Sequence, residues 1–352
     1  MEDILLEEGA GDGYDVPEHP HIEIVFDGLN DTLDNVSGNE SLTQAQHYLI
    51  GAMNAAGVLR TADVTGNESM FSAIGSGVTK AFEYIKNMFK SIYEFFFKRD
   101  GPKMVEETKK DLNDHSKLLD VVSTGGSNEQ ETEKVLAKQI SALKALGNES
   151  DTNKSALDQI LKEADEAHKS GSQAEKKKAV VMIGRELPKL NSKAKKVLGG
   201  KIDQLIAALK AFLKVVDDAL ADEATTTLAK DALKKLGTEK QTQTQLIAKL
   251  ESVRDIKNVA AAKDVLGAMV KDIGEFEGML KDYRQMEGHI GEQIRKLEAM
   301  MKENAKEDKV LKASLGDLRG LMTVISKITQ VFKAIFSRMV STQVSVNAMF
   351  GV

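Results

Sequence analysis

Apolar residues recur at helical spacing through most of the chain. Between Ile202 and Leu220 they fall three or four residues apart, and a longer series of the same kind runs from Leu311 to Met339. This spacing places apolar side chains on one face of an α-helix. Proline is absent after Pro188, which suits long helices, because an interior proline costs a helix about 3 kcal/mol. We expect an all-α fold whose body, residues 188–352, is an elongated antiparallel helical bundle or coiled coil.

Residues 102–187 are more polar than the body and contain several stretches rich in both lysine and glutamate. Glycine, serine and asparagine interrupt these stretches at 125–128, at 147–148 and at 170–172. Such residues favour turns, so the pattern predicts several polar helices separated by short breaks.

Residues 69–101 predict one amphipathic, aromatic-rich helix. Its apolar positions are Phe71, Ile74, Val78, Phe82, Ile85, Phe89, Ile92 and Phe96, three or four residues apart. A stripe of this kind belongs to a protein core or a helix–helix seam, and it can also lie on a membrane surface. The core interpretation is the favoured one.

Charge divides the chain into an acidic start and a basic remainder. Residues 1–68 hold fourteen acidic residues and one base, Arg60, a formal charge of −13. The whole chain carries −6, so the remainder carries +7. Acidic segments of this kind are typically solvated and can shield a basic body from its partners. We therefore expect residues 1–68 to be a largely disordered tail or propeptide, with one short strand-like run at 21–26.

The residue types needed for catalysis are missing or scattered. The chain has no cysteine, and its histidines lack the paired spacing of a metal site (His19, His21, His47, His115, His168 and His289). Phosphate-binding loops, nucleophile elbows and dinucleotide-binding glycine motifs are also absent from the sequence. The pattern predicts a protein that is not an enzyme and that needs no metal or other cofactor.

Nine bases and a single acid, Glu186, lie between residues 176 and 201. The bases are Lys176, Lys177, Lys178, Arg185, Lys189, Lys193, Lys195, Lys196 and Lys201. Such a cluster can contact nucleic-acid phosphates without sequence preference. No aromatic residue is interleaved to stack on bases, and a solvated helix face is the alternative interpretation.

One tetrapeptide, Gly-Asn-Glu-Ser, occurs three times, at 38–41, 66–69 and 147–150. Each copy lies at a predicted break between helical segments. Gly-Asn favours a turn and serine can cap the next helix, which offers a structural explanation. Many other turn sequences would serve equally well, and an exposed identical tetrapeptide is also what a processing protease reads.

The Gly-Asn-Glu before each serine resembles the cleavage motif of prohead proteases in giant tailed bacteriophages. The acidic and apolar start, Met1 to Ala10, is similar to propeptides that carry internal proteins into the assembling phage head. The chain thus resembles an internal head, or inner-body, structural protein. The resemblance implies processing between Glu40 and Ser41, between Glu68 and Ser69, or between Glu149 and Ser150.

On this interpretation the protein is a non-enzymatic virion protein of the capsid interior, present in the host cytoplasm during assembly. Its expected partners are other virion proteins, the prohead protease, further copies of itself and, without sequence preference, packaged DNA. Two alternatives stay open. One is a membrane-active helical translocator or pore-former, whose aromatic stripe enters lipid, and the other is a cytoplasmic coiled-coil scaffold.

Overall fold

The structure, a computed structural model, describes residues 19–34, 43–57, 83–88, 90, 100–149, 153–222, 227–252, 256, 258–282, 292, 295, 299 and 309–352. Within these ranges the chain is helical and contains no strand, which confirms the all-α prediction. The elongated antiparallel arrangement of the long helices stays a prediction.

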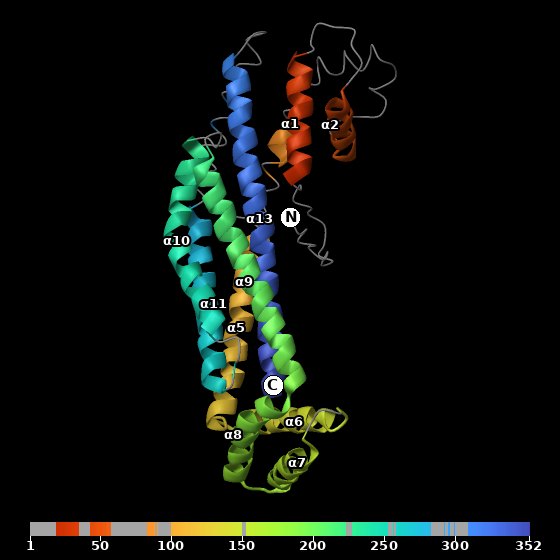
Figure 1. The fold of residues 1–352 in the computed structure, drawn as a ribbon, viewed down its shortest axis with the longest axis vertical. Helices are drawn as coiled ribbons and strands as arrows, with labels where there is room; N and C mark the ends of the chain where they lie inside the picture. Colours follow the sequence, from red (N-terminus) through yellow and green to blue (C-terminus); the bar gives the residue numbers. More distant parts are fainter. Residues whose placement is uncertain are drawn as a thin grey trace. The chain divides into compact units, whose positions relative to one another are not determined.

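The helices, in chain order, are α1 (His19–Asp34), α2 (Gln44–Ala55), α5 (Asp100–Thr124), α6 (Glu129–Leu146), α7 (Lys154–Lys169), α8 (Gln173–Leu190), α9 (Ser192–Ala221), α10 (Thr227–Ser252), α11 (Val259–Asp282) and α13 (Lys309–Phe350) (Figure 1). The breaks predicted at 125–128, 147–148 and 170–172 separate α5, α6, α7 and α8, as expected. The boundary expected at Pro188 is wrong, because Pro188 lies inside α8 and the break falls at Asn191.

The chain forms two compact units, each assembled from three separate stretches. Unit 1 contains residues 1–102, 214–237 and 279–330, and unit 2 contains residues 103–213, 238–278 and 331–352. α13 therefore gives its first half to unit 1 and its second half to unit 2. These units cut across the four linear segments expected from the sequence.

In unit 1, α1 and α2 pack against each other (Figure 1). Ile22, Val25, Phe26 and Leu29 of α1 are at most 1% exposed. The expectation of a disordered tail is therefore wrong for residues 19–34 and 43–57, and the strand-like run at 21–26 is helical. The four buried positions follow the i, i+3, i+4, i+7 pattern of one helix face, which gives these residues an apolar surface to bury.

Only part of the expected aromatic helix falls among the described residues. Residues 83–88 are helical, and Tyr84, Ile85 and Met88 are buried within unit 1. Glu83 and Lys86 are exposed on the other side. Ile85 belongs to the predicted stripe, so at this position the apolar side chain is part of the protein core.

Four phenylalanines form the centre of the unit 2 core. Phe276 of α11 lies edge-on to Phe212 of α9 and to Phe332 of α13, with ring centroids 5.7 and 4.4 Å apart. Phe336 follows Phe332 one turn later, 5.1 Å away. Each ring is at most 1% exposed. Edge-to-face aromatic packing adds about 0.5–1.5 kcal/mol per pair beyond the burial of apolar area.

The two long apolar stripes predicted from the sequence are confirmed. Those on α9 and α13 are buried from Ile202 to Val216 and from Leu315 to Met339. Leu220 is half-buried, and Leu311 lies outside the residues whose side chains are described. Regular spacing over five or more turns leaves little ambiguity about which face is apolar, which explains the agreement.

The uncharged end of α13 packs inside unit 2. Val346, Met349 and Phe350 are fully buried. Gly351 adopts a φ of +70°, and a side chain there would press against Leu187 of α8. The end of α13 thus packs against α6 and α8 of the same chain.

Candidate functional site

α6, α7 and α8 pack against one another within unit 2 (Figure 1), and α8 carries five of the nine bases that the sequence singled out. Each helix begins with a side-chain cap. Asn128, Asn153 and Ser172 accept hydrogen bonds from backbone N–H groups three residues later, at 2.8, 3.3 and 3.4 Å. Such caps satisfy N–H groups that have no partner inside the helix and contribute about 1 kcal/mol each.

The third Gly-Asn-Glu-Ser follows the last turn of α6. Gly147 is the C-cap residue, and the N–H groups of Asn148 and Glu149 donate to the carbonyls of Ala145 and Leu146, at 3.2 and 3.0 Å. Ser150 lies outside the described residues, and α7 begins at Lys154. This copy thus lies in the link between two packed helices, as the sequence predicted.

The serine of this motif does not cap the following helix. The cap of α7 is Asn153, three residues beyond Ser150. The link between α1 and α2 repeats this relation, because the cap of α2 is Thr43, two residues beyond Ser41. Capping therefore leaves the identity of the serine unexplained, and the interpretation of the serine as a helix cap is wrong at these two links. The turn predicted from Gly-Asn is present at Gly147 and Asn148.

The other predicted cleavage residues cannot be placed. Glu40, Ser41, Glu68 and Ser69 lie outside the described residues. The first copy falls between Asp34, where α1 ends, and Thr43, and the second between residues 57 and 83.

Glu149 joins the predicted cleavage motif to the basic cluster. Its carboxylate lies 3.5 Å from the Nζ of Lys193 at the start of α9, and about a third of the Glu149 side chain is exposed. The sequence placed these two residues in separate candidate sites. A protease that binds Glu149 has to break this ion pair, which costs little because exposed pairs contribute about 0–1 kcal/mol.

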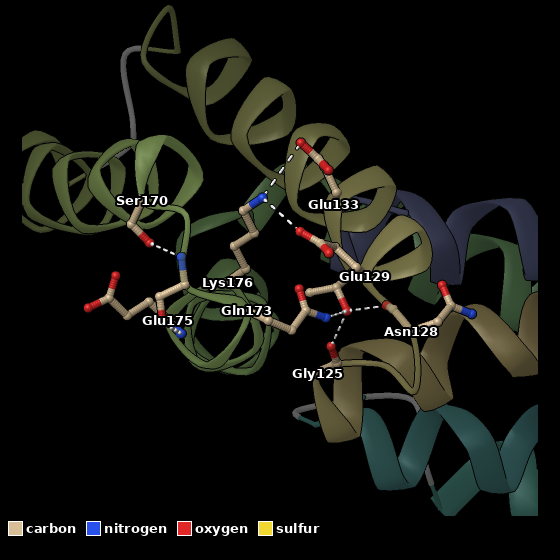
Figure 2. A network of polar contacts seen from close by, with 10 residues as sticks. Gly125, Asn128, Glu129, Glu133, Ser170, Gln173, Glu175 and Lys176 are labelled. Carbon is tan, nitrogen blue, oxygen red and sulfur yellow. Dashed lines mark hydrogen bonds and ion pairs between the residues drawn. The ribbon is translucent and has the colours of Figure 1, made fainter.

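Lys176 differs from the rest of the basic cluster, because its side chain is only 8% exposed. Its Nζ lies between the carboxylates of Glu129 and Glu133 on α6, 3.8 and 3.7 Å away (Figure 2). The prediction that Lys176 presents its charge to DNA is therefore wrong. The amphipathic stem fills the α6–α8 contact, and the ammonium group pairs with α6.

A second polar layer lies beside Lys176. Gln173 of α8 donates to the hydroxyl of Thr132 at 3.1 Å, and this hydroxyl lies 2.8 Å from the carbonyl oxygens of Gly125 and Asn128 (Figure 2). Thr132 is fully buried, so these bonds satisfy a group that would otherwise be costly. The layer fixes α8 against the N-terminus of α6.

Three of the remaining bases form a row on α8. Lys178, Arg185 and Lys189 are exposed and stand seven and four residues apart, which places them on one helix face. They span about 17 Å at 1.5 Å per residue. Glu186 pairs with Lys189 at 2.7 Å and reduces the positive potential at that end.

The other five bases are distributed over both helices. Lys193 and Lys196 are exposed on α9, whereas Lys177, Lys195 and Lys201 are half-buried. Lys177 lies against Gly125, where any side chain on the glycine would overlap it. The row on α8 and the two exposed bases of α9 therefore remain candidate phosphate contacts, without Lys176.

In unit 1, a cluster that the sequence did not indicate joins α1, α2 and residues 83–88. His21 places Nδ1 2.6 Å from the Tyr48 hydroxyl and Nε2 2.9 Å from the Tyr84 hydroxyl. Burial, and secondly Tyr48, raise the pKa of Tyr84 above its usual value, so this phenol keeps its proton. Asp27 of α1 pairs with Arg319 of α13 at 2.7 Å.

A buried acid in α11 was also missed, although a signal for it exists. Asp272 occupies the apolar stripe between Met269 and Phe276, at spacings of three and four. Its side chain is fully buried, and neither oxygen has a hydrogen-bond partner. Burial, followed by the nearby Glu275, raises the pKa of Asp272 to about 7.

Comparisons with protein-family models, curated proteins and solved structures find no match to this chain. Over the described residues, no helix combines the length and apolar character that crossing a membrane requires. The same part of the chain contains no group of three or more histidine, aspartate or glutamate side chains placed to hold a metal ion.

Proposed function

We propose that this protein is a non-enzymatic structural component of a phage head interior, matured by proteolysis at its Gly-Asn-Glu-Ser links. The observation that carries the proposal is the position of the repeats. The 147–150 copy begins in the link after α6, the 38–41 copy falls between α1 and α2, and serine is not the cap at either place. An identical tetrapeptide that capping does not require is consistent with recognition by a protease.

Processing would reverse the sign of the net charge of the chain. Removing residues 1–68 takes away −13 and converts a chain of −6 into one of +7. The exposed bases of α8 and α9 would then contact DNA through its phosphates, without reading sequence. On this proposal, the precursor stays off DNA during assembly and the mature form associates with the packaged genome.

The membrane-active alternative receives no support from the described part of the aromatic stripe. Tyr84, Ile85 and Met88 are 8%, 1% and 4% exposed. Side chains that already pack within unit 1 are unavailable to lipid unless unit 1 opens, and the core interpretation does not need this step.

The experiment is N-terminal sequencing and intact-mass measurement of the protein taken from its native particle. We expect a chain that begins at Ser41 or Ser69, with loss of the residues before it. A matched precursor, taken from cells before assembly, should begin at Met1. A particle protein that still begins at Met1 and carries its full mass would contradict the proposal.

A further inference from the structure

We propose that α1 and α2 form a docked two-helix cover that stays bound to the rest of unit 1 after the chain is cut beyond α2, so that cutting and release are separate steps. This inference rests on the proposed function only for the occurrence of a natural cut. The docking itself follows from contacts between residues before and after the predicted cleavage position at Glu68.

The apolar face of α1 needs more than α2 to cover it. Ile22, Val25 and Leu29 of α1 are completely buried. Leu49 and Met53 of α2 are 2% and 3% exposed. Helices of 16 and 12 residues are marginal on their own in water. Two such helices alone leave their seam partly open to solvent, so burial this complete requires further residues over the seam.

Two polar contacts identify the later residues that hold the cover. The Nε2 of His21 lies 2.9 Å from the hydroxyl of Tyr84, and the carboxylate of Asp27 lies 2.7 Å from the guanidinium of Arg319. Both partners follow Glu68 in the sequence. A tyrosine hydroxyl can donate or accept, so the imidazole keeps a partner for either ring nitrogen in each protonation state.

The two helices are built to move as one body. The cap residue of α2, Thr43, donates its hydroxyl proton to Asp31 of α1 at 2.5 Å. Gly28 of α1 lies so close to the carbonyl of Ala45 that a side chain there would overlap it. His21 also contacts Tyr48 of α2, at 2.6 Å. α1 and α2 therefore leave together or remain together.

This arrangement delays the reversal of charge. A chain that is cut after Glu68 but keeps its cover still carries −6 as a complex, and it becomes +7 only when residues 1–68 depart. While the two pieces share one chain, the linker keeps the cover at a high effective concentration, and this advantage ends with the cut. Release after cutting then depends on dilution, salt and competing partners.

The test uses the full chain with a site-specific protease sequence replacing residues 65–69. After complete cutting, we expect the two pieces to elute together in size-exclusion chromatography at low micromolar concentration and moderate salt. Pieces that separate as soon as the chain is cut would overturn the proposal. The same sample, denatured, shows that the cut is complete.

Two variants locate the contact. Arg319→Gln removes the partner of Asp27 and should speed release about two- to fivefold, whereas Lys327→Gln, an exposed change of equal charge on the same helix, should not. Phe26→Asp should abolish co-elution, and uncut Phe26→Asp protein reports whether the body still folds. Equal release rates for the Arg319 and Lys327 variants would show that the Asp27–Arg319 ion pair does not hold the two helices in place.

The engineered cut also separates this inference from the proposed function. A particle protein that begins at Met1 contradicts natural processing and leaves the docking result unchanged. Immediate separation of the engineered pieces contradicts the docking and leaves natural processing unchanged.

Discussion

Asp272 is fully buried, although aspartate side chains are usually exposed to solvent. A carboxylate without hydrogen-bond partners in an apolar core is costly when ionised, so the group keeps its proton to a higher pH. Its position between Met269 and Phe276 shows that an acid can occupy an apolar stripe without breaking the helix. The residue therefore links the stability of unit 2 to pH.

The first prediction concerns Asp272→Asn. In the folded state the pKa of Asp272 is about 7, above the usual aspartate value of 3.8, so the folded state binds the extra proton between these values. The free energy of unfolding of the native chain should fall as pH rises from about 4 to 7, by up to about 4 kcal/mol. The variant should lose this slope, as measured by urea unfolding at several pH values.

The exposed carboxylate of Asp264, on the same helix, provides the control. Asp264→Asn should leave the pH dependence of the native chain in place. The prediction would be contradicted if the unfolding free energy of the Asp272 variant fell between about pH 4 and 7 as steeply as that of the native chain.

Lys176 shows how neighbouring bases can have different roles. Its stem is buried against α6 while its charge meets two carboxylates, whereas Lys178, two residues later, is exposed. Sequence composition treats the two residues alike. Only the packing of α8 against α6 distinguishes them, and this long-range fact is absent from the local pattern.

The second prediction compares these two lysines. Lys176→Ala removes buried methylene groups and leaves Glu129 and Glu133 without their partner, so it should cost about 2 kcal/mol of unfolding free energy. The cost stays moderate because both glutamates remain more than half exposed and solvated. Lys178→Ala should change stability by less than about 0.5 kcal/mol. Thermal unfolding measures both, and equal effects would argue against the structural role of Lys176.

At the scale of elements, the long regular helices are the most predictable part of the chain. The stripes of α9 and α13 span many turns, so their faces could be read directly. α1 was misread because its apolar residues cluster at 22–26, where a short run fits a strand or a helix equally well. The high acid content of its surroundings added to the error, since charge reports on solubility rather than on fold.

The third prediction concerns the crossing of α1 and α2. Gly28→Ala places a methyl group into the backbone of Ala45, so the two helices must separate and lose packing, at a cost of about 2–3 kcal/mol. Gly51→Ala in α2 meets open space and should stabilise its helix by about 0.5–1 kcal/mol. Chemical denaturation of the full chain measures both changes. A neutral Gly28→Ala would mean that the helices do not approach this closely.

At the scale of the whole molecule, the sequence could indicate which residues are candidates and where links fall, but not how distant residues meet. The Glu149–Lys193 pair and the His21–Tyr84 contact join residues 44 and 63 positions apart. No local pattern encodes such pairs. The basic cluster was found from composition, and the structure then removed Lys176 and aligned Lys178, Arg185 and Lys189 into a row.

The fourth prediction tests this row on DNA. Protein freed of residues 1–68 should bind duplex DNA with an affinity that falls steeply with salt. Changing Lys178, Arg185 and Lys189 to glutamine should lower the salt slope by about 2–3, near 0.9 for each lost phosphate contact. Fluorescence anisotropy across a salt series measures the slope.

A triple variant of Lys103, Lys110 and Lys117, which are exposed on α5, removes the same charge from another helix. Its slope should change by less than half as much as that of the α8 variant. Equal slopes for the two variants would mean that net charge, and not the row on α8, governs binding.

The packing of the end of α13 against α6 joins two segments that are synthesised at different times. Gln139 donates its side-chain amide to the carbonyl of Phe350, 211 residues later in the chain. At ribosomal rates of about 5–20 residues per second, α6 emerges roughly 10–40 seconds before this partner exists. Until the chain end is synthesised, Gln139 and Leu187 lack the Phe350 and Gly351 that pack against them in the folded protein. A nascent chain stalled before residue 340 should therefore bind chaperones through α6 and α8, and completing the chain should end that association.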